Sequence, residues 1–195
     1  MPRENSTPTM RETELLELAY TYALEHGLAD MSLRPLAKAI GSSPRVLLYL
    51  FDSKEGLIRA LLARARIDEL ELLSRAPNFT DLGPDGLNIV AERLWSWLAA
   101  DGHRALLTLW VEGYARSLVD PEGPWGTFAR DTVNDWLKVL AAAQPRAERN
   151  TSAGRARRTL VLAVLRGALL DLLATGDLAR TTTAVHAQLR RTQRS

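Results

Sequence analysis

The side chains able to perform chemistry are scattered along this chain, except in one short stretch. The three histidines, His26, His103 and His186, are far apart, and cysteine is absent. No HExxH, Walker or nucleophile-elbow pattern occurs, and the carboxylates are spread over polar faces. We therefore expect no enzymatic activity, no metal site and no other cofactor.

The exception is a cluster of cations between residues 34 and 54. Arg34, Lys38, Arg45 and Lys54 are accompanied there by a single acid, Asp52, although the whole chain has a net charge of only +2. Arginine can bind guanine through two hydrogen bonds, and lysine, tyrosine and helix N-terminal amides suit phosphate oxygens. The stretch is therefore a candidate DNA-binding surface. Each residue alone is better explained as an ordinary solvated side chain, and the basic segments between residues 149 and 194 are a competing candidate.

Signals for starting and ending helices predict that this stretch is a helix-turn-helix. A helix that follows Ser32 ends at Gly41, where a left-handed backbone is needed. Ser43 can cap the next helix, which has Pro44 at its first position and continues to about Leu50. A third helix starts near Lys54. We expect Val46, Leu47 and Leu50 to be buried, so that the leading turn of the second helix is free to enter a major groove.

Residues 33–62 resemble the DNA-binding domain of the TetR family of bacterial transcriptional regulators. The resemblance rests on the spacing of the following residues: Gly41, Ser43, Leu47, Phe51, Ser53, Lys54, Glu55 and Leu57. It implies base contacts from Arg34, Pro44 and Arg45, phosphate contacts from Tyr49 and Lys54, and a place for Ser43 in the same interface.

Two residues of the second helix depart from the pattern of this family. Leu48 stands where the family usually has a phosphate-binding tyrosine, and Val46 stands where threonine or serine is common. Tyr49 is the residue that would replace the lost phosphate contact.

The remainder of the 195-residue chain, which is 46% hydrophobic, is also predicted to be helical. We expect an all-α fold with a three-helix helix-turn-helix domain, residues 1–66. A long helix joins it to a regulatory and dimerisation domain, residues 67–195. The first ten residues form a polar arm without an apolar secretion signal, and the apolar run 159–174 is too short to span a membrane. A cytoplasmic protein is therefore expected.

The C-terminal part holds all five tryptophans. The TetR resemblance implies an effector pocket there for a small apolar or aromatic molecule, although aromatic residues at helical spacing are usually packing. The residues expected to line it are Trp95, His103, Trp110, Tyr114, Phe128 and Trp136. Glu112 and Arg116 are expected to form a surface ion pair.

The last two long helices carry more apolar surface than one subunit needs. They predict a four-helix interface in a homodimer, with a purely intramolecular core as the alternative. Together with these helices, the TetR resemblance implies a ligand-responsive transcriptional repressor that binds a palindromic DNA operator as a homodimer and is released by a small molecule. The alternative is a helical protein-interaction adaptor without sequence-specific DNA binding.

Overall fold

The computed structural model describes residues 9–28, 31–75, 83, 85–123 and 125–193, without the side chains of residues 69–75 and 192–193. Within these ranges all regular structure is helical, as the sequence predicts. The chain divides into two compact units, the first formed by residues 1–69 and 108–129 and the second by residues 70–107 and 130–195.

The first unit begins with α1 (Met10–His26), which starts and ends at strong local signals. The Thr9 hydroxyl accepts a hydrogen bond from the Glu12 amide, and the Glu12 carboxylate accepts one from the Thr9 amide, which forms a capping box. Gly27, with φ of 76°, ends the helix. Residues 1–8 of the predicted arm lie outside the described residues.

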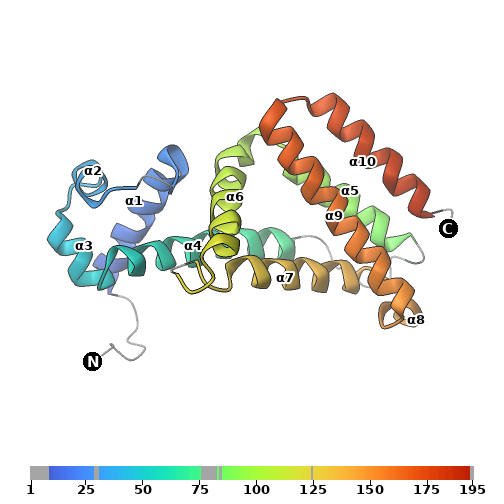
Figure 1. Cartoon of the computed structure of the whole chain (residues 1–195), viewed down its shortest axis with the longest axis horizontal. Helices are drawn as coiled ribbons and strands as arrows, with labels where there is room; N and C mark the ends of the chain where they lie inside the picture. The colour runs from blue at the N-terminus through green and yellow to red at the C-terminus, as the bar shows by residue number, and fades with distance from the viewer. Residues whose placement is uncertain (1–8, 29–30, 76–82, 84, 124, 194–195) are drawn as a thin grey trace. The chain divides into compact units, whose positions relative to one another are not determined.

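Three further helices follow closely in this unit: α2 (Leu33–Ala39), α3 (Pro44–Phe51) and α4 (Lys54–Arg75) (Figure 1). Their apolar faces meet α1 in a core that includes the fully buried Leu15, Leu36, Leu47, Leu57 and Leu61. This core holds the helix-turn-helix and leaves the opposite faces of α2 and α3 exposed.

The second unit contains α5 (Gly86–Leu98), the short α8 (Arg146–Arg149), α9 (Ser152–Thr175) and α10 (Leu178–Gln193). Its helices α5, α9 and α10 pack against one another, and α9 and α10 lie side by side (Figure 1). Gly176, with φ of 69°, ends α9 and allows the chain to turn into α10.

Three helices have residues in both units: α4, α6 (Arg104–Val119) and α7 (Phe128–Ala142). A 3₁₀ turn, η1 (Asp101–His103), precedes α6.

Helix α9 has one buried face within this chain, which includes Val161, Leu165 and Leu169. Leu160 and Leu170 are 47% and 51% exposed on the other side. No helix in the described part of the chain is both long and apolar enough to cross a membrane.

Candidate nucleic-acid interface

The turn between α2 and α3 is built by local backbone hydrogen bonds. The Ser42 amide donates to the Ala37 carbonyl at 2.8 Å, and Gly41 has a φ of 64°, which an L-residue adopts only with strain. Ser43 then caps α3 by accepting a hydrogen bond from the Val46 amide at 3.3 Å, with Pro44 at the first helical position. The predicted helix-turn-helix is therefore present.

Helix α3 has a buried face and an exposed face. Leu47 and Phe51 are 1% and 7% exposed, whereas Tyr49 is 66% exposed and Arg45 is also exposed. At 3.6 residues per turn, Arg45 and Tyr49 lie close to the side opposite Leu47. The two polar residues predicted to read DNA from this helix therefore face away from the core.

Val46 was expected in the core, and this prediction is wrong. Its side chain is 38% exposed, and that of the neighbouring Leu48 is 41% exposed, while Leu50 is half-buried. In so short a helix, Leu47 and Phe51 are enough to hold it against the core, so residue 46 lies at the flank.

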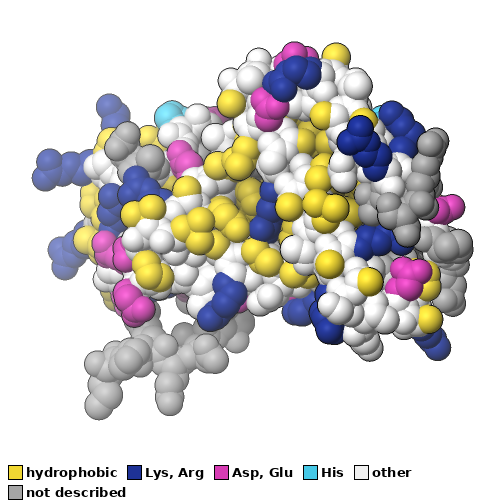
Figure 2. Space-filling model, turned by 45° about the vertical axis from the view of Figure 1, so that its right-hand side comes forward, with side chains coloured by type: hydrophobic (Ala, Val, Ile, Leu, Met, Phe, Trp, Pro, Cys, Tyr) yellow, Lys and Arg dark blue, Asp and Glu magenta, His cyan; other side chains and the backbone are white. Residues whose placement is uncertain are grey.

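The other predicted DNA-binding residues lie around α3. Arg34 is exposed on α2, while Ser43, Pro44 and Lys54 are half-buried, the last at the start of α4. Lysine and arginine side chains project from the region of α2 and α3, with hydrophobic side chains between them (left-hand side of Figure 2). The surface thus combines cationic, aromatic and aliphatic groups.

A polar network joins α1 to α4 behind this surface. The Tyr20 hydroxyl donates to Asp68 at 2.8 Å, and Arg64 donates to Glu17 at 2.6 Å and also to Asp68. The Arg64 guanidinium lies over the Tyr20 ring, 4.9 Å from its centroid. Burial, and then the hydrogen bond to Asp68, raise the pKa of Tyr20 above its ordinary value. Sequence reasoning missed this network, although the spacing of Arg64 and Asp68 is typical of a helical ion pair.

Helix α6 contributes a second brace within the first unit. The Glu112 carboxylate accepts a hydrogen bond of 2.7 Å from the backbone amide of Leu28, just beyond the end of α1. The predicted Glu112–Arg116 surface pair is therefore replaced by other contacts, and Arg116 instead lies over the Trp125 ring at 5.9 Å.

Close packing at Gly113 adds to this brace. A Cβ atom at this position would lie 2.9 Å from Leu62 Cδ2 and 3.2 Å from Phe128 Cε1. The middle of α6 therefore packs directly against α4 and the start of α7.

The residues predicted to bind an effector are distributed between the two units. Trp110, Tyr114 and Phe128 belong to the first, where the Trp110 and Tyr114 rings are 5.1 Å apart. Trp95, His103 and Trp136 belong to the second.

Two residues of the second unit have well-defined partners. The Trp95 indole donates to the Thr182 hydroxyl at 3.0 Å, and Trp95 is 1% exposed. His103 stacks on Trp97 with centroids 4.1 Å apart, and its Nδ1 is 2.9 Å from the Trp97 carbonyl oxygen. These contacts are typical of packing, and an effector role for these residues stays a prediction.

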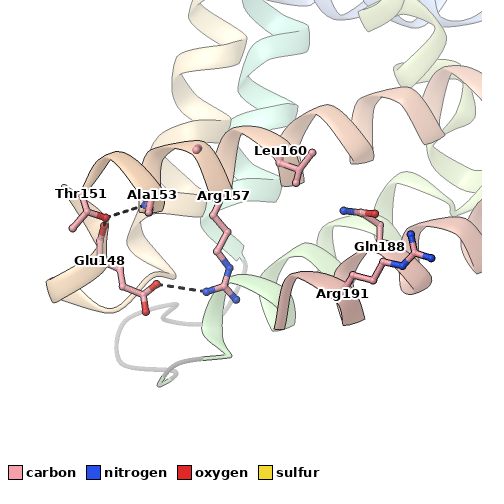
Figure 3. Close-up of a pocket in the computed structure, with 9 residues that line it drawn as sticks. Glu148, Thr151, Ala153, Arg157, Leu160, Gln188 and Arg191 are labelled. Carbon is pink, nitrogen blue, oxygen red and sulfur yellow. Dashed lines mark hydrogen bonds and ion pairs between the residues drawn. The ribbon is translucent and has the colours of Figure 1, made fainter. Parts of the chain in front are cut away.

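A groove of about 580 Å³ lies elsewhere in the second unit, between the start of α9 and the end of α10 (Figure 3). Arg157 of α9 pairs with Glu148 at 3.5 Å on one side, and Gln188 and Arg191 of α10 lie on the other. None of the residues predicted to bind an effector lines this groove. The described residues contain no cluster of metal-ligating side chains.

Comparisons with known proteins agree with this architecture. A family model described as "Bacterial regulatory proteins, tetR family" matches residues 15–61, which include α2 and α3. No match was found among curated proteins. Solved structures with the same fold include the multidrug binding protein EbrR in complex with imidazole. It is 23% identical, with a TM-score of 0.71, over 98% of this chain and 96% of that one.

Two other structures show the same correspondence. EbrR in complex with proflavin has a TM-score of 0.70 and 22% identity over 93% of this chain and 99% of that one. A putative TetR-family transcriptional regulator from Rhodococcus sp. has a TM-score of 0.74 and 16% identity over 95% and 100%. Residues 15–61 thus match the helix-turn-helix region of the TetR family of bacterial regulators. The chain has the fold of solved structures that include a putative member of that family.

Proposed function

We propose that this chain binds a palindromic DNA operator as a homodimer, represses transcription from it, and is released when a small molecule binds the regulatory part. The observation that carries the proposal is the position of Arg45 and Tyr49 on the exposed face of α3, opposite Leu47 and Phe51. A short helix held in this way presents cationic and aromatic groups to a major groove. Such a role places the protein in the bacterial cytoplasm.

The proposed homodimer uses the exposed face of α9. At 3.6 residues per turn this face lies opposite Val161 and Leu165, and its positions alternate by three and four residues, which is the spacing of a helix–helix seam. Small side chains allow close approach, and Leu160 and Leu170 supply apolar area. The exposed positions are Ala153, Ala156, Leu160, Ala163, Gly167, Leu170 and Ala174.

An arginine in this seam tests the dimer. Ala163→Arg should convert a dimer to a monomer in sedimentation velocity, because it places an unpaired charge in an apolar contact. Ala63→Arg is the matched control, because Ala63 is exposed on α4 in the first unit. A wild-type monomer, or a dimer that survives Ala163→Arg, would contradict the proposed interface.

Selection of duplexes from a random pool tests the DNA-binding function. The full chain at moderate salt should enrich a palindrome with half-sites about 10 base pairs apart, which corresponds to one turn of the double helix between two recognition helices. Retention of DNA without enrichment of any sequence, or no retention, would favour the protein-interaction adaptor instead.

Two substitutions separate the proposed roles in the interface. Lys54→Ala should weaken binding to all sequences and lower the salt dependence by about one counterion, whereas Arg45→Ala should mainly relax base preference. Arg93→Ala is the control, because Arg93 is exposed on α5 in the second unit. Equal effects of Lys54→Ala and Arg45→Ala on specific and random DNA would refute the assignment.

Proflavin is a suitable first probe for an effector, because a structural relative was solved with it. We expect proflavin to weaken operator binding only if it binds more tightly to a conformation that cannot bind DNA than to the conformation that can. Trp110→Ala and Tyr114→Ala should then weaken proflavin binding in a fluorescence titration. Tight proflavin binding that leaves operator affinity unchanged would exclude it as an effector.

A further inference from the structure

Two aliphatic side chains stand on the exposed part of α3, and the proposed contacts of Arg45 and Tyr49 do not use them. Val46 and Leu48 are 38% and 41% exposed, on a helix that Leu47 and Phe51 already hold against the core. A single exposed leucine needs no explanation, since much of any protein surface is apolar. Two such residues beside Arg45 on one eight-residue helix are a more specific feature.

Their positions around the helix are symmetric. At 3.6 residues per turn, Val46 and Leu48 are about 160° apart around the axis of α3. Arg45 and Tyr49 lie between them, along a line on the helix surface that runs parallel to this axis. When that line faces the base pairs, Val46 lies at one flank of the helix and Leu48 at the other. The similar exposed fractions of the two side chains agree with this placement.

The chemistry of these side chains limits what they can contact in DNA. Neither has a hydrogen-bonding group, so neither can bind a phosphate oxygen or the polar edge of a base. The major groove offers one apolar group that differs between base pairs, the 5-methyl group of thymine. This methyl group lies beside the strand that carries it, where the flank of an inserted helix passes.

We propose that Val46 and Leu48 are specificity-determining residues that each contact a thymine 5-methyl group, one on each strand of the half-site. The inference rests on the proposed DNA-binding function, which it makes more precise. The half-site should contain a guanine bound by Arg45, with a thymine on each strand close to it. This apolar component of recognition does not depend on salt, unlike the contact of Lys54 with phosphate.

Deoxyuridine substitution in the selected operator tests the inference with the unaltered full-length chain. Replacing thymine by deoxyuridine removes only the methyl group and keeps the base pair. Loss of one buried methyl group should weaken binding about fourfold, at about 0.8 kcal/mol per group. We expect this loss at one thymine per strand in each half-site. Replacing thymines that α3 does not contact should leave binding unchanged.

Variants then assign each methyl group to a side chain. Val46→Ala should abolish the deoxyuridine effect on one strand and preserve it on the other, and Leu48→Ala should do the reverse. Lys38→Ala serves as the control, because it removes an exposed cation of α2 and should preserve both deoxyuridine effects. Circular dichroism checks that each variant is folded, and the deoxyuridine measurement on the unaltered chain stands even when a variant is not.

The outcomes separate this inference from the function on which it rests. If no sequence is enriched, the DNA-binding function itself fails. If a palindrome is enriched but every deoxyuridine probe binds as tightly as its thymine counterpart, the function stands and the inference is overturned. If both variants abolish the same deoxyuridine effect, the assignment of one residue to each strand is overturned.

Discussion

Glu112→Ala should destabilise the first unit by removing the contact between α6 and the end of α1. The Glu112 carboxylate accepts the hydrogen bond of the Leu28 amide at 2.7 Å, and the Leu28 residue is 2% exposed. A hydrogen bond to a charged acceptor contributes about 1.5–3 kcal/mol, and a buried amide left unpaired costs a similar amount. Because Glu112 itself is half-buried, we expect a loss of about 2 kcal/mol, near the middle of that range.

Glu112→Gln separates the charge of the acceptor from its shape. The glutamine amide oxygen can accept the same hydrogen bond without the charge, so the expected loss is about half that of alanine, or about 1 kcal/mol. Glu122→Ala is the control for removal of a surface carboxylate, because Glu122 is exposed in the turn after α6. Its effect should stay within about 0.5 kcal/mol.

Urea unfolding followed by circular dichroism and tryptophan fluorescence provides the measurement. Trp110 and Trp125 both lie in the first unit and report on its unfolding. The expected order of destabilisation is Glu112→Ala, then Glu112→Gln, then Glu122→Ala. If Glu112→Ala is no more destabilising than Glu122→Ala, the hydrogen bond to Leu28 does not hold the end of α1 and the reasoning is refuted.

Three further experiments test other parts of the fold. Trp95→Phe and Thr182→Val should show a coupling of about 1 kcal/mol in a double-mutant cycle, as expected for one hydrogen bond, and additive effects would refute that contact. Gly41→Ala should cost about 1–2 kcal/mol in urea unfolding, because φ there is 64° and no neighbouring atom would clash, so a neutral result would contradict backbone strain. Hydrogen bonds from Arg180 lower the pKa of Asp171, so the stability contributed by this carboxylate is present above its unfolded pKa and is lost as pH falls through its folded pKa. Arg180→Gln should raise the Asp171 titration midpoint in a carbon-detected NMR experiment, and an unchanged midpoint would exclude that cause.

The helix-turn-helix could be predicted because its determinants are local. Gly41, Ser43 and Pro44 each act on the backbone within a few residues, so the turn and the start of α3 follow from the sequence alone. The same holds for the end of α1 at Gly27. The apolar run 159–174 marks only part of α9, which begins at Ser152 and ends at Thr175, because apolar periodicity marks a helix face better than its ends.

The contacts that join distant segments were not predictable in this way. The Tyr20–Asp68 and Leu28–Glu112 hydrogen bonds join residues 48 and 84 positions apart. Nothing in the local pattern of Glu112 distinguishes an acceptor for Leu28 from one member of a surface pair. Val46 illustrates the same limit within one helix, because a run of aliphatic residues has several possible buried faces and only the packed core selects one.

The division of the chain also depends on such distant contacts. Sequence reasoning proposed a functional boundary between residues 66 and 67, whereas residues 108–129 pack in the same compact unit as α1 to α3. Gly113 makes this possible, since any side chain there would meet Leu62 and Phe128. Helix α6 starts in the second unit and ends in the first, so it is a covalent connection between the two in addition to α4. Within the first unit, the hydrogen bond between the Leu28 amide and Glu112 therefore joins α6 to the end of α1.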